Sequence, residues 1–168
     1  MIPLIPEIMM PILRDVRTKD ERELLREQVG ELEAALFRSD PKATERILKS
    51  HLPEDLADAM RNVLAAPQFK NSPEAIRKFF QDLRDVIDKM PLLKLSIAFK
   101  PTEEMISRLH EWTQEYIGPG VVLDISYDSS MLGGARIIFG GKYKEMTLAQ
   151  IITDVFAKEK TTVMGMIK

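Results

Sequence analysis

The first half of the chain has the hydrophobic spacing of amphipathic helices. Thr18 and Glu21 stand three residues apart, which is the spacing of a capping box at a helix start. The apolar positions that follow recur every three or four residues, as on one face of a helix: Leu25, Val29, Leu32 and Leu36. The pattern therefore predicts a first helix that begins just after Thr18.

Three more helices are predicted before residue 91. Asp40-Pro41 begins a short helix with Ile47 and Leu48 inward, and Pro53 begins the next one. Apolar residues share one face of that next helix: Leu56, Met60, Val63 and Leu64. Ser72-Pro73 begins the most strongly amphipathic helix, whose inward positions are Ile76, Phe79, Phe80, Leu83, Val86, Ile87 and Met90. Short proline-marked loops between such helices favour an antiparallel helical bundle over residues 1–90.

At Pro91 the hydrophobic period changes from that of a helix to that of a strand. Residues 93–99 alternate, with Leu93, Leu95, Ile97 and Phe99 on one side. Thr102 caps a helix whose predicted inward residues are Met105, Leu109, Trp112 and Tyr116. Strands follow at 121–127 and 135–139, then Gly140-Gly141 turns the chain into 142–144. Thr147 caps a last helix with Leu148, Ile151, Ile152, Val155 and Phe156 on one side. Residues 91–168 thus form a small α/β module (strand–helix–strand–strand–helix), and the fold class is α+β.

The opening segment 1–13 is apolar, but it does not match an export signal or a membrane span. The first basic residue, Arg14, follows the apolar run, whereas a signal peptide has its positive charge before it. Pro3, Pro6 and Pro11 interrupt a stretch shorter than the roughly 20 residues of a membrane helix. We expect an arm that packs on its own domain or on a partner, in a cytosolic protein.

Composition leaves little material for catalysis or metal binding. The chain has no cysteine and two histidines, and its net charge is −2. His51 is placed at the end of a short helix and His110 on the solvent side of its helix, so neither is a metal-ligand candidate. Neither half has the basic surplus that a nucleic-acid backbone attracts. We therefore predict no catalytic residue, no cofactor, no metal and no nucleic-acid partner.

The glycine pairs at 133–134 and 140–141 are predicted to be turns around a strand. A phosphate-binding loop needs glycine five residues before Gly141, where Arg136 stands, and Tyr143 follows Lys142 in place of Ser or Thr. Gly133 and Gly134 are expected to supply positive φ angles or a close backbone approach. Asp124 and Asp128 are interpreted as part of a solvated strand face rather than an acid–base pair.

The segment 121–148 carries the one distinctive motif. It has an acidic residue, small residues, Leu-Gly-Gly, a strand with an arginine, a turn with lysine, an acidic residue, and Thr-Leu at the start of a helix. The motif residues are Asp128, Ser129, Ser130, Leu132, Gly133, Gly134, Arg136, Ile137, Lys142, Glu145, Thr147 and Leu148. With the preceding strand and helix, residues 92–158 resemble the C-terminal domain of the delta subunit of F-type ATP synthases, the oligomycin-sensitivity-conferring protein family.

The resemblance implies a structural role without catalysis. A member of this family is a peripheral-stalk, or stator, subunit of the proton-translocating ATP synthase at the cytoplasmic face of the bacterial inner membrane. Its N-terminal bundle would bind the N-terminal segments of the alpha subunits, and its C-terminal module would bind the C-terminal end of the b subunits. Membrane association would come only through the complex. The motif positions Asp128, Leu132, Gly133, Gly134, Arg136, Lys142, Thr147 and Leu148 would be structural.

Other classes of function stay open at this point. A stator or adaptor of a related rotary ATPase, or of the flagellar-export apparatus, could have a similar C-terminal module. Those proteins usually place one long helix before it, whereas Pro41, Pro53, Pro67 and Pro73 divide the first half of this chain. An enzyme or nucleotide-binding module is a further alternative that the glycine spacing disfavours.

Overall fold

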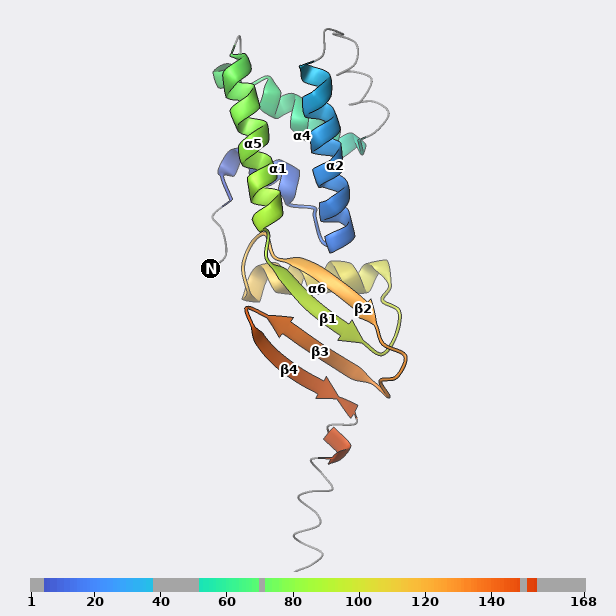
Figure 1. The fold of residues 1–168 in the computed structure, drawn as a ribbon. Helices are drawn as coiled ribbons and strands as arrows, with labels where there is room; N and C mark the ends of the chain where they lie inside the picture. The colour runs from blue at the N-terminus through green and yellow to red at the C-terminus, as the bar shows by residue number, and fades with distance from the viewer. Residues whose placement is uncertain (1–4, 38–51, 70–71, 149–150, 154–168) are drawn as a thin grey trace, which may run out of the picture. The chain divides into compact units, whose positions relative to one another are not determined.

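The computed structural model describes residues 5–37, 52–69, 72–148 and 151–153, and their fold belongs to the mixed α+β class (Figure 1). The chain divides into two compact units. The first comprises Met1–Pro91 and His110–Val122, and the second comprises Leu92–Leu109 and Leu123–Lys168. The short helix predicted after Asp40-Pro41, with Ile47, Leu48 and His51, lies outside the described residues.

Helix α2, Lys19–Leu36, begins at the predicted capping box. The Thr18 hydroxyl accepts a hydrogen bond from the Glu21 amide at 3.2 Å, and the Glu21 carboxylate accepts one from the Thr18 amide at 3.0 Å. Two amides that a helix start leaves without partners are satisfied in this way. The buried face of α2 consists of Leu25, Val29, Leu32 and Ala35. The predicted stripe is thus confirmed except at its end, where Ala35 is buried and Leu36 is only partly so.

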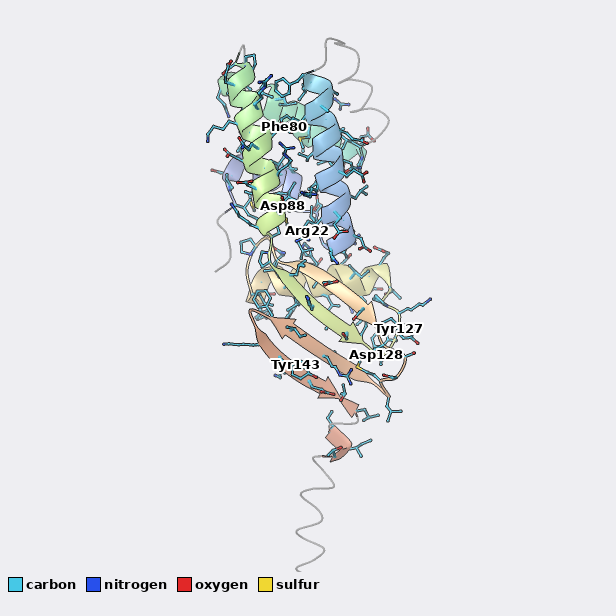
Figure 2. The ribbon with its side chains drawn as sticks, in the orientation of Figure 1. Arg22, Phe80, Asp88, Tyr127, Asp128 and Tyr143 are labelled. Atoms are coloured by element: carbon cyan, nitrogen blue, oxygen red, sulfur yellow. The ribbon has the colours of Figure 1, made fainter. Side chains whose placement is uncertain are left out.

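Helix α5, Pro73–Lys89, packs antiparallel against α2 (Figure 1). The Ser72 hydroxyl caps its start, and Phe80, Leu83 and Ile87 are fully buried, as their spacing predicts. Phe80 is labelled on α5 and Arg22 on α2 in Figure 2. At the margin of the contact Arg26 pairs with Asp88 at 2.6 Å and Arg84 with Glu33 at 2.9 Å. Because these ion pairs are partly exposed to solvent, each contributes at most about 1 kcal/mol to stability.

The described part of the opening segment, residues 5–13, packs in the first unit with several of its side chains buried. It forms the 3₁₀ turn η1, Glu7–Met9, and the short helix α1, Met10–Leu13. Met9, Ile12, Leu13 and Val16 are buried. Helix α1 contacts α4, Glu54–Leu64, whose buried residues are Ala57, Met60 and Val63. A second 3₁₀ turn, η2 at Pro67–Phe69, brings the Phe69 ring edge-on to Phe79 at 5.3 Å.

A four-stranded sheet is the centre of the second unit. Its strands are β1 at Leu92–Ile97, β2 at Val122–Tyr127, β3 at Gly134–Phe139 and β4 at Lys142–Thr147, in the order β2-β1-β3-β4. Helix α6, Glu103–Tyr116, connects the parallel neighbours β1 and β2 (Figure 1). Strand β3 runs antiparallel to both β1 and β4. Gly140 and Gly141, with φ of 56° and 76°, form the predicted tight turn between β3 and β4.

The two faces of this sheet differ in polarity. The predicted inward residues of β1 (Leu93, Leu95 and Ile97) are buried, whereas Phe99 lies beyond the strand and is exposed. On the opposite face the register places Ser96 beside Arg136 and Arg136 beside Glu145. Because directly paired residues point to the same side of a sheet, these polar side chains share one face.

The predicted orientation of α6 is wrong in its second half, whereas the predicted inward residues Met105 and Leu109 are partly buried. Trp112 and Tyr116, expected inward, are exposed, whereas His110, expected in solvent, is buried together with Thr113. Gln114 explains the rotation of the helix. Its side chain donates to the Val121 carbonyl at 3.2 Å and accepts from the Gly120 amide at 3.1 Å, so it ties the helix to the following segment. The face that carries His110, Thr113 and Gln114 must therefore point inward.

Replacing the N-cap, as Thr18→Ala, is expected to lower the free energy of unfolding by about 1 kcal/mol, because an amide of the first turn loses its hydrogen-bond acceptor. Urea denaturation of both proteins measures the difference. Thr18→Ser keeps the acceptor and should lose much less. Equal losses in the two variants would show that the hydroxyl does not cap α2.

Candidate partner-binding sites

An apolar groove lies between α1, α2 and α4 in the first unit. It has a volume of about 300 Å³, and its walls include Ile12, Val16, Leu24 and Leu56. Ile12 and Val16 are buried at the base, whereas the Leu24 side chain remains 52% exposed. The groove is a candidate surface for a partner because several apolar residues line it together.

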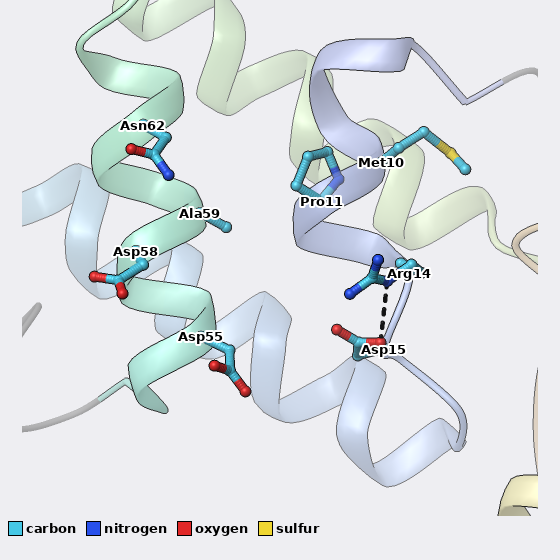
Figure 3. Close-up of a pocket in the computed structure, with 8 residues that line it drawn as sticks. All are labelled: Met10, Pro11, Arg14, Asp15, Asp55, Asp58, Ala59 and Asn62. Carbon is cyan, nitrogen blue, oxygen red and sulfur yellow. Dashed lines mark hydrogen bonds and ion pairs between the residues drawn. The ribbon is translucent and has the colours of Figure 1, made fainter.

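An acidic hollow adjoins this groove between α1 and α4 (Figure 3). Its volume is about 540 Å³, and the two cavities share Pro11, Asp15 and Asp55. Asp58 adds a third carboxylate, and Arg14, which pairs with Asp15 at 3.4 Å, is the basic residue of the lining. Groove and hollow together offer apolar contact beside negative charge. That combination suits an amphipathic helix with basic residues.

The polar sheet face of the second unit is organised around Arg136. Its guanidinium donates to Asp128 at 3.0 Å and to Glu145 at 3.4 Å. Glu145 also accepts from the Tyr143 hydroxyl at 2.5 Å and from the Thr147 hydroxyl at 2.8 Å. Asp128 and Tyr143 are labelled in Figure 2. The cluster joins the end of β2 to β3 and β4.

The electrostatics of this cluster keep every member in its ordinary charge state at neutral pH. Hydrogen bonds from Ser130, with the charge of Arg136, hold the pKa of Asp128 below its usual value. Hydrogen bonds from Tyr143, Thr147 and Arg136 lower the pKa of Glu145. The Glu145 carboxylate raises the pKa of Arg136 and that of Tyr143. A carboxylate with a lowered pKa is a poor general base or acid at neutral pH, so the cluster is suited to structure rather than proton transfer.

The structure brings only some of the predicted motif residues together. Asp128, Arg136 and Thr147 meet through Glu145, whose central place follows from the β3–β4 register. Lys142 lies at the turn end of β4, opposite Phe139, apart from the cluster. The part played by Tyr143 was missed, although its place two residues before Glu145 on one strand face could have indicated it.

Gly134 has the conformation predicted for the Leu-Gly-Gly segment. Its φ is 92°, and a Cβ there would collide with the Met146 carbonyl oxygen and stand 2.8 Å from the Thr147 Cα. Gly133, in contrast, has no positive φ, and its carbonyl accepts the Leu148 amide at 3.0 Å. The close approach that allows β3 to begin beside the end of β4 thus belongs to Gly134.

An apolar end of the second unit lies where the segments of Leu132 and Leu148 meet beside this glycine pair. Leu132 is 76% exposed, and Leu148 is also exposed. The Gly133–Leu148 hydrogen bond places the Leu132 and Leu148 segments side by side. This apolar end, with Leu132 as its most exposed member, is the second candidate for a partner contact.

His110 is buried in the interior of the described fold. Because the Gln114 amide nitrogen lies 2.9 Å from His110 Nε2 and is a donor, that ring nitrogen accepts and carries no proton. Burial lowers the pKa of His110, while the carboxylates of Glu21, Asp15 and Glu111 oppose the shift. In the described part of the chain no three His, Cys, Asp or Glu residues gather closely enough to hold a metal ion.

Gly134→Ala is expected to reduce the free energy of unfolding by at least about 2 kcal/mol, because the methyl group would overlap the β4 backbone at an unfavourable φ. Gly140→Ala is the matched control. Gly140 also has a positive φ, but nothing lies within 4 Å of a Cβ there. Its loss should be about 1 kcal/mol. Thermal or urea unfolding measures both, and equal losses would contradict the close approach.

Lowering the pH below about 6.5 is expected to decrease the free energy of unfolding through His110. The unfolded chain binds the proton first, since the folded pKa is lower, and the decrease ends once the pH passes below the folded pKa. His110→Gln should remove this component of the pH dependence. Urea denaturation between about pH 7.5 and pH 5.5 measures the slopes. Glu21 affects stability only at lower pH, because its folded pKa lies below 4.5.

No protein-family model matches this chain, and no curated protein is significantly similar to it. Among the described helices, none combines the length and apolar content that crossing a membrane requires.

Proposed function

We propose that this chain is a non-catalytic peripheral-stalk component of a proton-translocating F-type ATP synthase, with the part that the delta subunit has in that family. It would link the alpha subunits of the catalytic head to the stalk of b subunits, as a stator at the cytoplasmic face of the bacterial inner membrane. Its membrane association would come only through the complex.

The observation that carries the proposal is the role of the motif residues in the second unit. Gly134 permits the β3–β4 approach, and Arg136 connects Asp128 with Glu145. Some of the residues on which the resemblance rests, namely Asp128, Gly134 and Arg136, therefore join the end of β2 to β3 and β4. A sequence motif that specifies packing and no reactive group supports membership of a family whose work is mechanical.

The first unit supports the proposal through the arrangement of its helices. We infer that residues 1–90 form an antiparallel helical bundle around the α2–α5 pair. The separate helices α2, α4 and α5 favour the delta-type protein over related stators with one long helix. The apolar groove beside the acidic hollow would take the N-terminal segment of one of the alpha subunits, bound as an amphipathic helix.

The second unit would supply the other attachment. Its apolar end around Leu132 and Leu148 is an exposed hydrophobic surface, which the C-terminal end of the b subunits would cover. A stator must hold both partners through many rotor cycles, which calls for buried apolar contact and slow dissociation.

Leu24→Glu is expected to weaken binding of a synthetic alpha peptide, taken from the N-terminal segment of the host's alpha subunits, at least about tenfold. The reason is that a charge would enter the apolar groove. Calorimetric titration measures the affinity. The folded state should persist, since Leu24 is half exposed. Binding of a b peptide, taken from the C-terminal end of the host's b subunits, should not change.

Leu132→Glu is the reciprocal variant, expected to weaken binding of the b peptide and to leave binding of the alpha peptide unaffected. The proposal is wrong if neither peptide binds the unmodified chain. It is also wrong if cells that lack the chain keep ATP synthesis coupled to proton flow.

A further inference from the structure

The second half of α6 carries an aromatic pair that the described residues of the chain leave exposed. The Trp112 and Tyr116 rings stack with centroids 5.8 Å apart and an interplanar angle of 27°. Trp112 is 46% exposed and Tyr116 67%. Aromatic side chains held in one orientation, yet left in solvent, carry contact area that is ordinarily buried in a protein interface.

The exposure of the pair is a consequence of how α6 is held. His110 and Thr113 form the buried face, and Gln114 bonds to the backbone of Gly120 and Val121. At 100° per residue, Trp112 and Tyr116 lie well around the helix from His110. Rotating α6 to bury the rings would break the Gln114 contacts and bring His110 into water. The fold therefore keeps the aromatic pair outside.

Two carboxylates stand beside the pair. Glu111 precedes Trp112, and Glu115 precedes Tyr116, one helical turn later. Neither glutamate forms an ion pair with another described residue of the chain. An aromatic face with carboxylates at its edge attracts a cation through two interactions. One is with the quadrupole of the rings, and the other is with the negative charge of the carboxylates.

We propose that Trp112, Tyr116, Glu111 and Glu115 form a docking surface for a basic amphipathic helix of a partner protein. Arginine suits it best, since a planar guanidinium stacks on a ring and still donates to a carboxylate. The chain makes such a stack elsewhere, where the Arg77 guanidinium lies 4.5 Å above the Phe37 ring. Two rings one turn apart match two basic residues one turn apart on the partner helix.

This proposal goes beyond the stator assignment and does not depend on it. The apolar groove is lined by α1, α2 and α4 residues, and none of the four residues of the aromatic pair's surface belongs to it. The two sites can therefore be tested separately.

Trp112 is the chain's single tryptophan, so its fluorescence reports this surface directly. The probe is a synthetic 18-residue helical peptide (about 27 Å long) with leucines on one face and arginines beside them. The control peptide has glutamates in place of the arginines. We expect a saturable change in Trp112 emission with the arginine peptide and none with the glutamate peptide.

Matched variants of the full chain locate the contact. Glu111→Gln with Glu115→Gln, and separately Tyr116→Ala, should each weaken binding of the arginine peptide at least about fivefold. Glu23→Gln with Glu27→Gln is the control, since it removes the same charge from exposed positions on α2. Leu24→Glu should leave the Trp112 response unchanged, which separates this surface from the apolar groove. Circular dichroism verifies that each variant is folded.

Several results would overturn the proposal. One is an unchanged emission at saturating arginine peptide; another is an equal response to the glutamate peptide. Full affinity in the Glu111, Glu115 double variant would also refute it. So would concentration-dependent dimerisation that shifts Trp112 emission without peptide, because the surface would then bind a second copy of this chain.

Discussion

An amphipathic helix can bury only one face, and the helices of this chain carry more apolar surface than their packing removes from water. Helices α2 and α5 each bury one apolar face. The buried residues are Val29, Leu32, Phe80, Leu83 and Ile87. Burial of this kind supplies most of the stability of a small domain. Apolar side chains that stay exposed are then informative, because the packing of the core does not require them.

Three groups among the exposed apolar side chains of the described residues are candidates for partner contacts. Leu24 borders the apolar groove, Leu132 leads the apolar end of the second unit, and Trp112 with Tyr116 stacks on α6. Leu24 lies beside the carboxylates of the acidic hollow. Leu132 lies beside the backbone hydrogen bond between Gly133 and Leu148. The aromatic pair lies beside Glu111 and Glu115. These groups are the surfaces to which the proposed partners would bind. The polar network around Arg136 joins the end of β2 to β3 and β4, and its hydrogen bonds lower the pKa of Asp128 and Glu145.

Local chemistry made much of the fold predictable. The Thr18–Glu21 capping box, the Ser72 cap and the alternation of β1 all describe interactions between residues a few positions apart, and each is present. The candidate partner-binding sites were harder to predict from the sequence. Glu145 and Tyr143 join Arg136 through the strand register, and the groove beside Leu24 exists only because α1 and α4 flank α2. Spacing within β4 places Tyr143 and Glu145 on one face, but it does not show which residues of β3 or of other helices lie beside them.

Helix α6 shows which features the sequence determines and which the tertiary structure decides. By itself the sequence determined that residues 103–116 form a helix and that Trp112 and Tyr116 share a side of it, because helical periodicity is a local property. Which side faces inward was decided by tertiary structure. The apolar stripe favoured one rotation, but the Gln114 hydrogen bonds to Gly120 and Val121, with burial of His110 and Thr113, selected another. Hydrophobicity ranks the faces of an isolated helix, whereas the packed chain must also satisfy its buried hydrogen-bonding groups.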